Sequence, residues 1–571
     1  MNQKSEKSME QYFFRASAAD FKKIPGSPIA YWLSTKVIEI FSRGESLAKY
    51  SKGSTGLQTS DSASFLRFCH EPGKSSIGEK WIRFAKGGGY RKWYGNVEHV
   101  VNWENSGAAI KGYVANKYPY LKGNYALVVK NESTYFLKGL LTSRVTSGKL
   151  SFRIKSEHEI YADACTAIFP NDELFFLALL STKIFGVVQD LNPTINFQAS
   201  DVEKFPVVQE ALKVSCVQLA TECISLSKKD WDSYEITWDF QCLPLLQAES
   251  RQLTLKGTYQ SLRAHWHEMT QEMKRLEENN NNIFIDAYGL QSELDADVSL
   301  SDISLTCNPH YRYGGVKTEA ELEAKLQADT MCEFLSYAVG CMFGRYSLDK
   351  PGLVLANQGE TLVDYLRQIP EPRFMPDEDN VIPLLDGEWF ADDVTERFRT
   401  FLRVTFGEEH YEENLAFIEA SLGKDVRKYF IKDFYTDHVK RYKKRPIYWL
   451  FASPKGTFSA LIYLHRYRQD TVSVVLQYLR DFRKKLAARL DYLQQVGISA
   501  SASQGEKTRA LKEIETLKKQ LLELDDYERD TLYPLATEQL PLDLDDGVKV
   551  NYLKLGSALK KIVGLDAKGE D

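Results

Sequence analysis

Residues 80–105 read KWIRFAKGGGYRKWYGNVEHVVNWEN, and this stretch is the most informative for the fold of the first part of the chain. Two β-prone runs, WIRFA and HVVNW, flank a triple glycine at residues 87–89. Glycine permits backbone conformations that residues with a Cβ atom avoid, so an irregular connection is expected there. Basic, aromatic and polar side chains crowd the same stretch: Arg83, Lys86, Arg91, Lys92, Trp81, Tyr90, Trp93, Tyr94, Trp103, Asn96, Asn102, Glu104 and Asn105.

This mixture of residue types has two interpretations. Positive charge, flat rings and polar side chains together are typical of a surface that contacts the phosphates and base edges of nucleic acid. The alternative is a glycine-rich hairpin that packs its aromatic side chains into a core. The DNA contacts expected under the first interpretation are Arg83, Lys86, Arg91, Lys92, Trp93, Tyr94, Asn102, Trp103 and Glu104.

Working outward, short β-prone runs alternate with turns up to residue 160, among them YALVV, TYFLKGLL and LSFRI. A helical pattern follows at residues 173–190, ELFFLALLSTKIFGVVQD. We therefore expect residues 1–19 to be a polar lead-in and residues 20–210 to form one mixed α/β domain, within an α+β chain.

Helices are expected to dominate residues 211–571. The predicted helices cover 214–228, 251–279, 319–343 and 408–430, and the run of four asparagines at 279–282 is expected to end the second one. Farther on, leucines at 486, 490 and 493 share one helix face, and Ile514, Leu517, Leu521 and Leu524 repeat at alternating gaps of three and four. GISASASQG between them predicts a turn, hence an antiparallel helical hairpin at about 478–530. Such a hairpin is either an ordinary bundle pair or a partner-binding arm.

Composition limits the class of protein. The 571 residues carry a net charge of -5 with a pI of about 6.1, so any DNA contact must come from a local basic surface. The eight cysteines form no C-x-x-C pair and the N-terminus lacks the apolar core of a secretion signal, which is typical of reduced thiols in the cytoplasm. No apolar run reaches the length of a membrane helix, so no membrane partner is expected.

Two further stretches are candidate DNA contacts. Small hydroxyl residues beside arginine and lysine can approach phosphates and base edges closely, which points to Thr142, Ser143, Arg144, Thr146, Ser147, Lys149 and Arg153. A basic run near residue 440 adds Lys443, Lys444 and Arg445. For this run the alternative is a solvated cluster of charges.

No motif supports catalysis by this chain. Asn308-Pro309-His310-Tyr311 resembles the Asp/Asn-Pro-Pro-Tyr/Phe loop of amino-methyltransferases, but histidine replaces the second proline and the preceding SLSDISLT is mostly polar. Neither glycine cluster, 87–89 nor 314–315, has the apolar strand before it and the helix after it that an S-adenosylmethionine site needs. We therefore expect no catalytic, cofactor-binding or metal-binding residue.

Long phrases carry a resemblance to a known family. FKKIPGSPIAYW, KGGGYRKWYGNVEHVVNWEN, TSRVTSGKLSFR, YAVGCMFGRYSLDKPGLVLANQG, KKRPIYWLFASPKGTFSALIYLHRYR and DGVKVNYLKLGSALKKI are among them. The chain resembles the C-terminal half of the PglX adenine-specific DNA methyltransferases of BREX phage-exclusion systems, from about residue 20 to about 563. The family's methyltransferase domain, with its cofactor turn and catalytic Asn-Pro-Pro-Tyr, has no counterpart here.

The resemblance implies a division of roles. Residues 20–210 would be a DNA target-recognition domain, and residues 211–571 would complete a clamp around double-stranded DNA. Chemistry and S-adenosylmethionine would belong to a methyltransferase domain supplied in cis or in trans, and other phage-defence proteins would be partners. Two alternatives stay open: a self-sufficient adenine methyltransferase that uses residues 308–311, and a non-catalytic interaction subunit of the defence complex.

Overall fold

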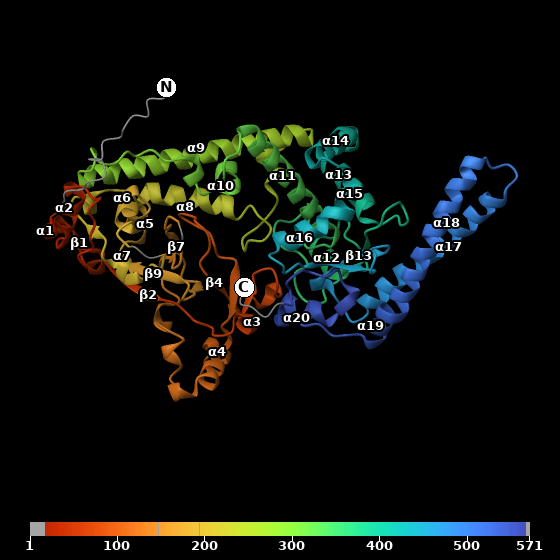
Figure 1. Ribbon diagram of the computed structural model, residues 1–571, viewed down its shortest axis with the longest axis horizontal. Coiled ribbons are helices and arrows are strands. Elements are labelled where there is room, and N and C mark those ends of the chain that lie inside the picture. Colours follow the sequence, from red (N-terminus) through yellow and green to blue (C-terminus); the bar gives the residue numbers. More distant parts are fainter. Residues whose placement is uncertain (1–16, 147, 193–194, 567–571) are drawn as a thin grey trace, which may run out of the picture. The chain divides into compact units, whose positions relative to one another are not determined.

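The computed structural model describes residues 17–146, 148–192 and 195–566 (Figure 1). Helix makes up 52% of it and strand 10%, in several small sheets, so the predicted α+β class is confirmed. The chain forms two compact units: unit 1 holds residues up to 61, 82–231 and 266–316, and unit 2 holds the remainder. The functional division predicted near residue 210 stays a prediction. Within the described ranges, no helix has the length and apolar character needed to cross a membrane.

Unit 1 is built on β-structure. An antiparallel sheet has the strand order β2 (Ser51–Thr55), β9 (Cys165–Pro170), β6 (Gly139–Ser143) and β7 (Arg153–Lys155). A second group places β5 (His99–Asn102) next to β4 (Trp81–Ala85), which pairs in parallel with β8 (Glu159–Tyr161). The runs WIRFA and HVVNW are therefore strands, as predicted. A short pair, β1 (Glu45–Ser46) and β10 (Pro206–Val207), completes the β-structure of the unit's described residues.

Helices cover this β-structure. The pattern at 173–190 is confirmed as α5 (Glu173–Leu180) and α6 (Lys183–Gln189), and α8 (Val217–Trp231) matches the helix predicted at 214–228. Asp172 begins α5 by accepting a hydrogen bond from the backbone N–H of Phe175 at 2.9 Å. The other α-helices lying wholly within unit 1 are α1 (Ala18–Phe21), α2 (Thr35–Arg43), α4 (Glu104–Lys117), α7 (Ala199–Glu203) and α10 (Pro309–Tyr313).

The asparagine run does not end its helix, so that prediction was wrong. Helix α9 (Leu255–Tyr288) continues through all four asparagines. The buried side-chain amides of Asn280 and Asn281 donate to the carbonyls of Ala178 (2.9 Å) and Ala296 (3.1 Å). Because these amides bond to other segments, they do not compete for the backbone of their own helix.

YALVV is also not a strand. Residues Tyr125–Leu127 form a 3₁₀ turn in the connection that runs from α4 to β6, and most of their side chains are exposed. A run of β-prone residues becomes a strand only where neighbouring strands pair with it and bury one of its faces.

Unit 2 is mostly helical. The helix predicted at 319–343 is α11 (Glu319–Met342), and the one predicted at 408–430 is two helices, α14 (Tyr411–Leu422) and α15 (Val426–Tyr429). Gly423, with φ +67°, separates them as a left-handed C-cap. A small sheet has the order β11 (Ile382–Pro383), β13 (Ser459–Tyr463) and β12 (Tyr448–Ala452). Unit 2 also contains α3 (Ser62–Phe65), β3 (Leu66–Phe68), α12 (Leu362–Gln368), α13 (Val394–Phe406), α16 (Tyr435–Arg441), α19 (Tyr533–Glu538) and α20 (Gly547–Lys554).

The helical hairpin is confirmed as α17 (Thr471–Ile498) and α18 (Gln504–Tyr527). Three ion pairs join successive positions on α17 to progressively earlier positions, from just beyond the end of α18 back to its middle, as antiparallel helices require: Arg480–Glu528, Arg483–Asp525 and Arg489–Glu513. The predicted seam is buried at Leu486, Leu493, Ile514, Leu517 and Leu524.

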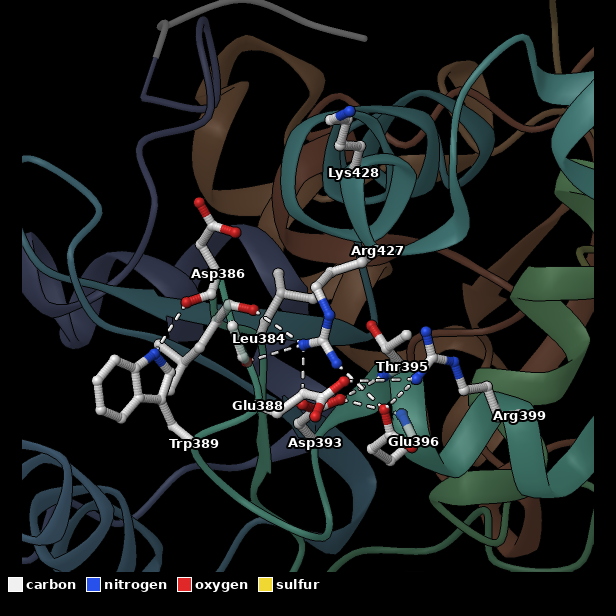
Figure 2. Close-up of polar contacts among 12 residues, drawn as sticks. Leu384, Asp386, Glu388, Trp389, Asp393, Thr395, Glu396, Arg399, Arg427 and Lys428 are labelled. Carbon is white, nitrogen blue, oxygen red and sulfur yellow. Dashed lines mark hydrogen bonds and ion pairs between the residues drawn. The ribbon is translucent and has the colours of Figure 1, made fainter. Parts of the chain in front are cut away.

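One arginine ties three segments of unit 2 together (Figure 2). The Arg427 guanidinium of α15 donates to the carbonyl of Gly387 at 2.9 Å and pairs with Asp393 (2.9 Å) and Glu396 (3.2 Å). Asp393 is 1% exposed and also caps α13 by accepting from the backbone N–H of Thr395 at 2.8 Å. The start of α13 and the preceding loop therefore depend on a buried, charge-assisted cluster.

Candidate nucleic-acid interface

The two stretches singled out in unit 1 lie against each other. The backbone N–H of Trp93 donates to the carbonyl of Phe152 at 2.9 Å, and the N–H of Ile154 donates to the carbonyl of Trp93 at 2.9 Å. Ser143 Oγ also donates to the carbonyl of Gly88 at 2.8 Å. Residues 86–96, called the glycine-rich loop below, are thus packed beside β7 and the end of β6.

Arg91 anchors the glycine-rich loop from inside. Its guanidinium is 2% exposed, pairs with Asp230 of α8 at 2.8 Å and lies 4.8 Å from the ring of Trp231. It also donates to the carbonyls of Tyr94 (2.8 Å) and Ser227 (3.2 Å). At Gly95, with φ +126°, a Cβ atom would stand 2.5 Å from Arg91 Nε, so this position needs glycine.

Glu277 of α9 holds the next two residues. Its carboxylate oxygens accept from Lys92 Nζ at 2.6 Å and from Trp93 Nε1 at 2.9 Å. Burial alone would lower the pKa of Lys92, but the adjacent Glu277 carboxylate raises it above the usual lysine value. The polar groups of Lys92 and Trp93 are therefore bound to Glu277 within the protein.

Other predicted contacts are also internal. Arg153 is 3% exposed, donates to the carbonyl of Arg91 at 3.3 Å, and has a pKa lowered by burial. Thr142 and Trp103 are buried as well. Arg91, Trp93, Trp103, Thr142 and Arg153 thus position the loops, and they do not face solvent as base readers would. The core-packing alternative raised for the aromatic rings holds for Trp93 and Trp103.

The remaining predicted contacts of unit 1 lie at or near the surface. Lys149 is the most exposed cation among them, with its side chain 68% exposed and Nζ 2.7 Å from Asp302. Arg144 Nε donates to Asn196 Oδ1 at 3.1 Å, and Thr146 Oγ1 accepts from the backbone N–H of Gly148. Glu104 is exposed, whereas Arg83, Lys86, Tyr94, Asn102 and Ser143 are half-buried. Ser147 lies outside the described residues.

A cavity of about 750 Å³ lies where the two stretches meet α6. Tyr90 and Lys92 line it from the glycine-rich loop, and Thr146, Lys149 and Ser151 line it from the second stretch. Residues of α6, of α9 and of the segment after α9 contribute to the wall, including Lys183, Gln189, Asn281 and Asp302. Lys149 pairs with Asp302 and Lys183 with Asp295, so the lining offers hydrogen-bonding groups with partly compensated charge.

The basic run near residue 440 belongs to unit 2. Lys443 and Lys444 are exposed and have positive φ angles of 50° and 60° in the turn after α16. Arg445 is 8% exposed, and its carbonyl lies 3.0 Å from Nε2 of the buried His70. Of this run, the two lysines are presented to solvent and Arg445 is part of the packing.

Residues 308–311 form a helix start. Asn308 is fully buried, and its Oδ1 accepts from the backbone N–H of His310 at 3.1 Å. Its amide nitrogen donates to the carbonyls of Leu300 (2.7 Å) and Ile303 (2.9 Å), and Tyr311 Oη donates to the carbonyl of Tyr90. The asparagine is an N-cap of α10 whose hydrogen-bonding groups are already used within the fold. Among the residues that the structure describes, no cluster of three or more His, Cys, Asp or Glu side chains can hold a metal ion.

Sequence patterns missed the acidic partners that hold the glycine-rich loop, because Asp230 and Glu277 lie 139 and 185 positions from the residues they bind. They also missed a group of exposed tyrosines and lysines in residues 104–138. Lysines and tyrosines recur through this stretch of the sequence and could have indicated the group, but YALVV was interpreted as a strand.

Comparison with known proteins gives two similar sequences. The chain is 36% identical to the adenine-specific methyltransferase BrxX of Escherichia coli O9:H4 (strain HS) over 572 residues, and 34% identical to the adenine-specific methyltransferase PglX of Lacticaseibacillus casei (strain Zhang) over 586 residues. These matches cover 95% and 97% of this chain but 45% and 46% of the relatives. The chain therefore spans about half the length of the relatives that it matches. No family model matches it.

Proposed function

We propose that this chain is the DNA-recognition and clamping portion of an S-adenosylmethionine-dependent N6-adenine DNA methyltransferase of a BREX-type phage-defence system. The observation that carries the proposal is similarity to two adenine-specific methyltransferases along nearly the whole chain, at 34–36% identity. In this proposal the chain corresponds to the C-terminal half of a PglX-type enzyme, acts in the cytoplasm, and works with a methyltransferase domain in cis or in trans and with other phage-defence proteins.

The proposed DNA contacts of unit 1 are the predicted residues that are exposed or half-buried, two of which, Thr146 and Lys149, line the 750 Å³ cavity. Arg83, Lys86, Tyr94, Asn102, Glu104, Ser143, Arg144, Thr146 and Lys149 form this set, and Ser147 belongs with it by sequence. Lys443 and Lys444 of unit 2 would hold phosphates. Arg91, Lys92, Trp93, Trp103, Thr142, Arg153 and Arg445 act indirectly by fixing the backbone that carries these contacts.

S-adenosylmethionine would be bound by the methyltransferase domain. Within the described residues, the glycines at 87–89 follow strand β4 but lead into an irregular loop, and those at 314–315 follow helix α10. Neither place offers the strand–turn–helix cradle in which such cofactors lie. The buried, bonded Asn308 gives no support to a self-sufficient methyltransferase that uses residues 308–311.

Binding of fluorescently labelled duplex DNA to the purified chain, measured by anisotropy across a salt series, tests the proposal. Five cations, Lys86, Arg144, Lys149, Lys443 and Lys444, are proposed phosphate contacts, so log K should fall with log salt with a slope of about -4.5. Selection from a random duplex pool should enrich one sequence. A slope shallower than about -1, or no enrichment, would contradict the proposal.

Titration calorimetry with S-adenosylmethionine separates the proposal from its enzymatic rival. The expected result is no heat of binding. One-to-one binding would mean that the chain holds its own cofactor site, and residues 308–311 would again become the leading catalytic candidate.

A further inference from the structure

Residues 104–138, called the projecting segment below, form an excursion between β5 and β6 of unit 1. It consists of α4 and three 3₁₀ turns, Pro119–Leu121, Tyr125–Leu127 and Glu132–Thr134. In Figure 1, α4 and the turns after it extend away from the strands of the same unit. The side chains of the projecting segment therefore form a surface separate from that of the sheet.

Aromatic and polar contacts fix the base of the projecting segment. The ring of Tyr135 meets those of Trp103 and Tyr161 edge to face, at centroid distances of 5.4 Å and 6.0 Å. Asn131 donates from its side chain to the carbonyl of Thr55 at 2.8 Å, and Lys117 Nζ donates to the carbonyl of Ser60 at 2.6 Å. The segment is thus an ordered part of the unit, held where its two ends enter and leave the sheet.

The segment exposes large apolar side chains. Tyr120 is 75% exposed, Leu127 58%, Leu137 47% and Phe136 44%. Exposed apolar residues that occur singly are ordinary, but several on one small excursion are typical of a surface that contacts another molecule.

The charge of the segment favours a polyanion as that molecule. Residues 104–138 contain five lysines (111, 117, 122, 130 and 138) and two acidic residues (Glu104 and Glu132), a net charge of +3 within a chain of net charge -5. Lys111 neutralises Glu132 at 2.6 Å, whereas Lys117, Lys122, Lys130 and Lys138 are exposed. Lysines interspersed with tyrosines suit a phosphate backbone beside sugar and base surfaces.

We propose that the projecting segment is a second DNA-contacting surface of unit 1, in which Lys122 and Lys130 contact phosphates and Tyr120 and Leu127 contact sugars or bases. The inference rests on the proposed function, because it assumes that the chain binds duplex DNA. It adds contacts that reach beyond the cavity and that hold the duplex independently of its sequence.

The test compares two double variants of the full chain with the same change in charge. K122E/K130E alters the projecting segment, whereas K518E/K519E alters two exposed lysines on α18 of unit 2. Duplex binding is followed by anisotropy in a salt series, and thermal unfolding verifies that both variants are folded. We expect K122E/K130E to lower the salt slope by about 2 and to weaken binding equally for all sequences, with a smaller effect from the control. A photo-crosslinking residue at position 120 should also attach to the duplex.

Each outcome bears on a defined claim. Equal losses in the two variants would show that net charge decides affinity, which overturns the inference. Unchanged affinity of K122E/K130E, with normal binding by the unaltered chain, overturns this inference alone and assigns the apolar face to a protein partner. No duplex binding by the unaltered chain refutes both this inference and the proposed function.

Discussion

Replacing Arg91 with methionine should strongly destabilise the glycine-rich loop, because Arg91 anchors it through a buried ion pair. The change removes an ion pair between side chains that are 2% (Arg91) and 1% (Asp230) exposed. It also removes one donor from each of the carbonyls of Tyr94 and Ser227, although Ser227 Oγ still donates to the Tyr94 carbonyl at 3.1 Å. Breaking a buried ion pair by removing one partner costs about 3–5 kcal/mol. The lower end applies here, since Asp230 still accepts from the backbone N–H groups of Thr306 and Cys307 at 2.7 Å and 2.8 Å.

Hydrogen–deuterium exchange of the intact chain measures this effect locally, because a protein with two compact units has no single unfolding free energy. A loss of about 3 kcal/mol corresponds to roughly 100-fold faster exchange of the amides in residues 86–96 and 150–155. Lys149→Met is the matched control: its ion pair to Asp302 is as short, at 2.7 Å, but the lysine side chain is 68% exposed. We expect less than about threefold faster exchange there. Equal exchange in Arg91→Met and the unaltered chain would refute the argument that burial of this pair holds the loop.

Three further predictions concern unit 2 and residues 308–311. Arg427→Ala should destabilise unit 2 by about 3 kcal/mol, because the buried Asp393 loses its ion pair and keeps the backbone N–H donors of Thr395 and Glu396. Lys428→Ala breaks an exposed pair with Asp425 at 3.1 Å and should leave the thermal unfolding midpoint nearly unchanged, so similar midpoints in both variants would contradict this. Burial, reinforced by the charge of Arg345, lowers the pKa of His465 to about 3 and those of His70 and His438 well below the usual value. Below about pH 6.5 the unfolded chain therefore binds protons that the folded chain does not. The free energy of unfolding should then decrease as the pH is lowered, by up to about 1.4 kcal/mol per pH unit for each histidine. His465→Gln should flatten a plot of the unfolding midpoint against pH. His158→Gln, the control, should not, because the His158 side chain is 82% exposed. Parallel plots for the two variants would argue against buried neutral histidines. Asn308→Ala should lower stability by about 1–3 kcal/mol, without changing duplex affinity, because it removes the acceptor of the His310 backbone N–H and one donor to each of the carbonyls of Leu300 and Ile303. Lost affinity at unchanged stability would show that Asn308 acts on the ligand.

Local patterns predicted those parts of the fold whose cause is local. The hairpin of α17 and α18 could be inferred because its apolar seam repeats within each helix, from Leu486 to Leu493 and from Ile514 to Leu524. The strands WIRFA and HVVNW and the helices at 173–190 and 319–342 follow from periodicity and capping in the same way. These signals depend on neighbours a few positions away.

Errors occurred where distant segments decide the structure. The asparagine run stays helical because Asn280 and Asn281 find hydrogen-bond partners at Ala178 and Ala296, which the local sequence does not reveal. YALVV lacks a neighbouring strand, so its β-propensity has no effect. For the candidate interface, the sequence singled out two stretches that lie against each other in unit 1, but it did not separate surface cations from internal ones.

The sequence by itself determined the residue types, the α+β class, the hairpin and the resemblance to adenine-specific DNA methyltransferases. Only the tertiary structure decided that Arg91, Trp93 and Arg153 lie inside and that Lys149 and the lysines of the projecting segment lie outside. The physical reason is that an arginine can be buried only where a carboxylate and carbonyls offset its desolvation. Asp230 and Ser227 do so for Arg91 from a helix some 140 residues further along the chain, and folding alone brings them together.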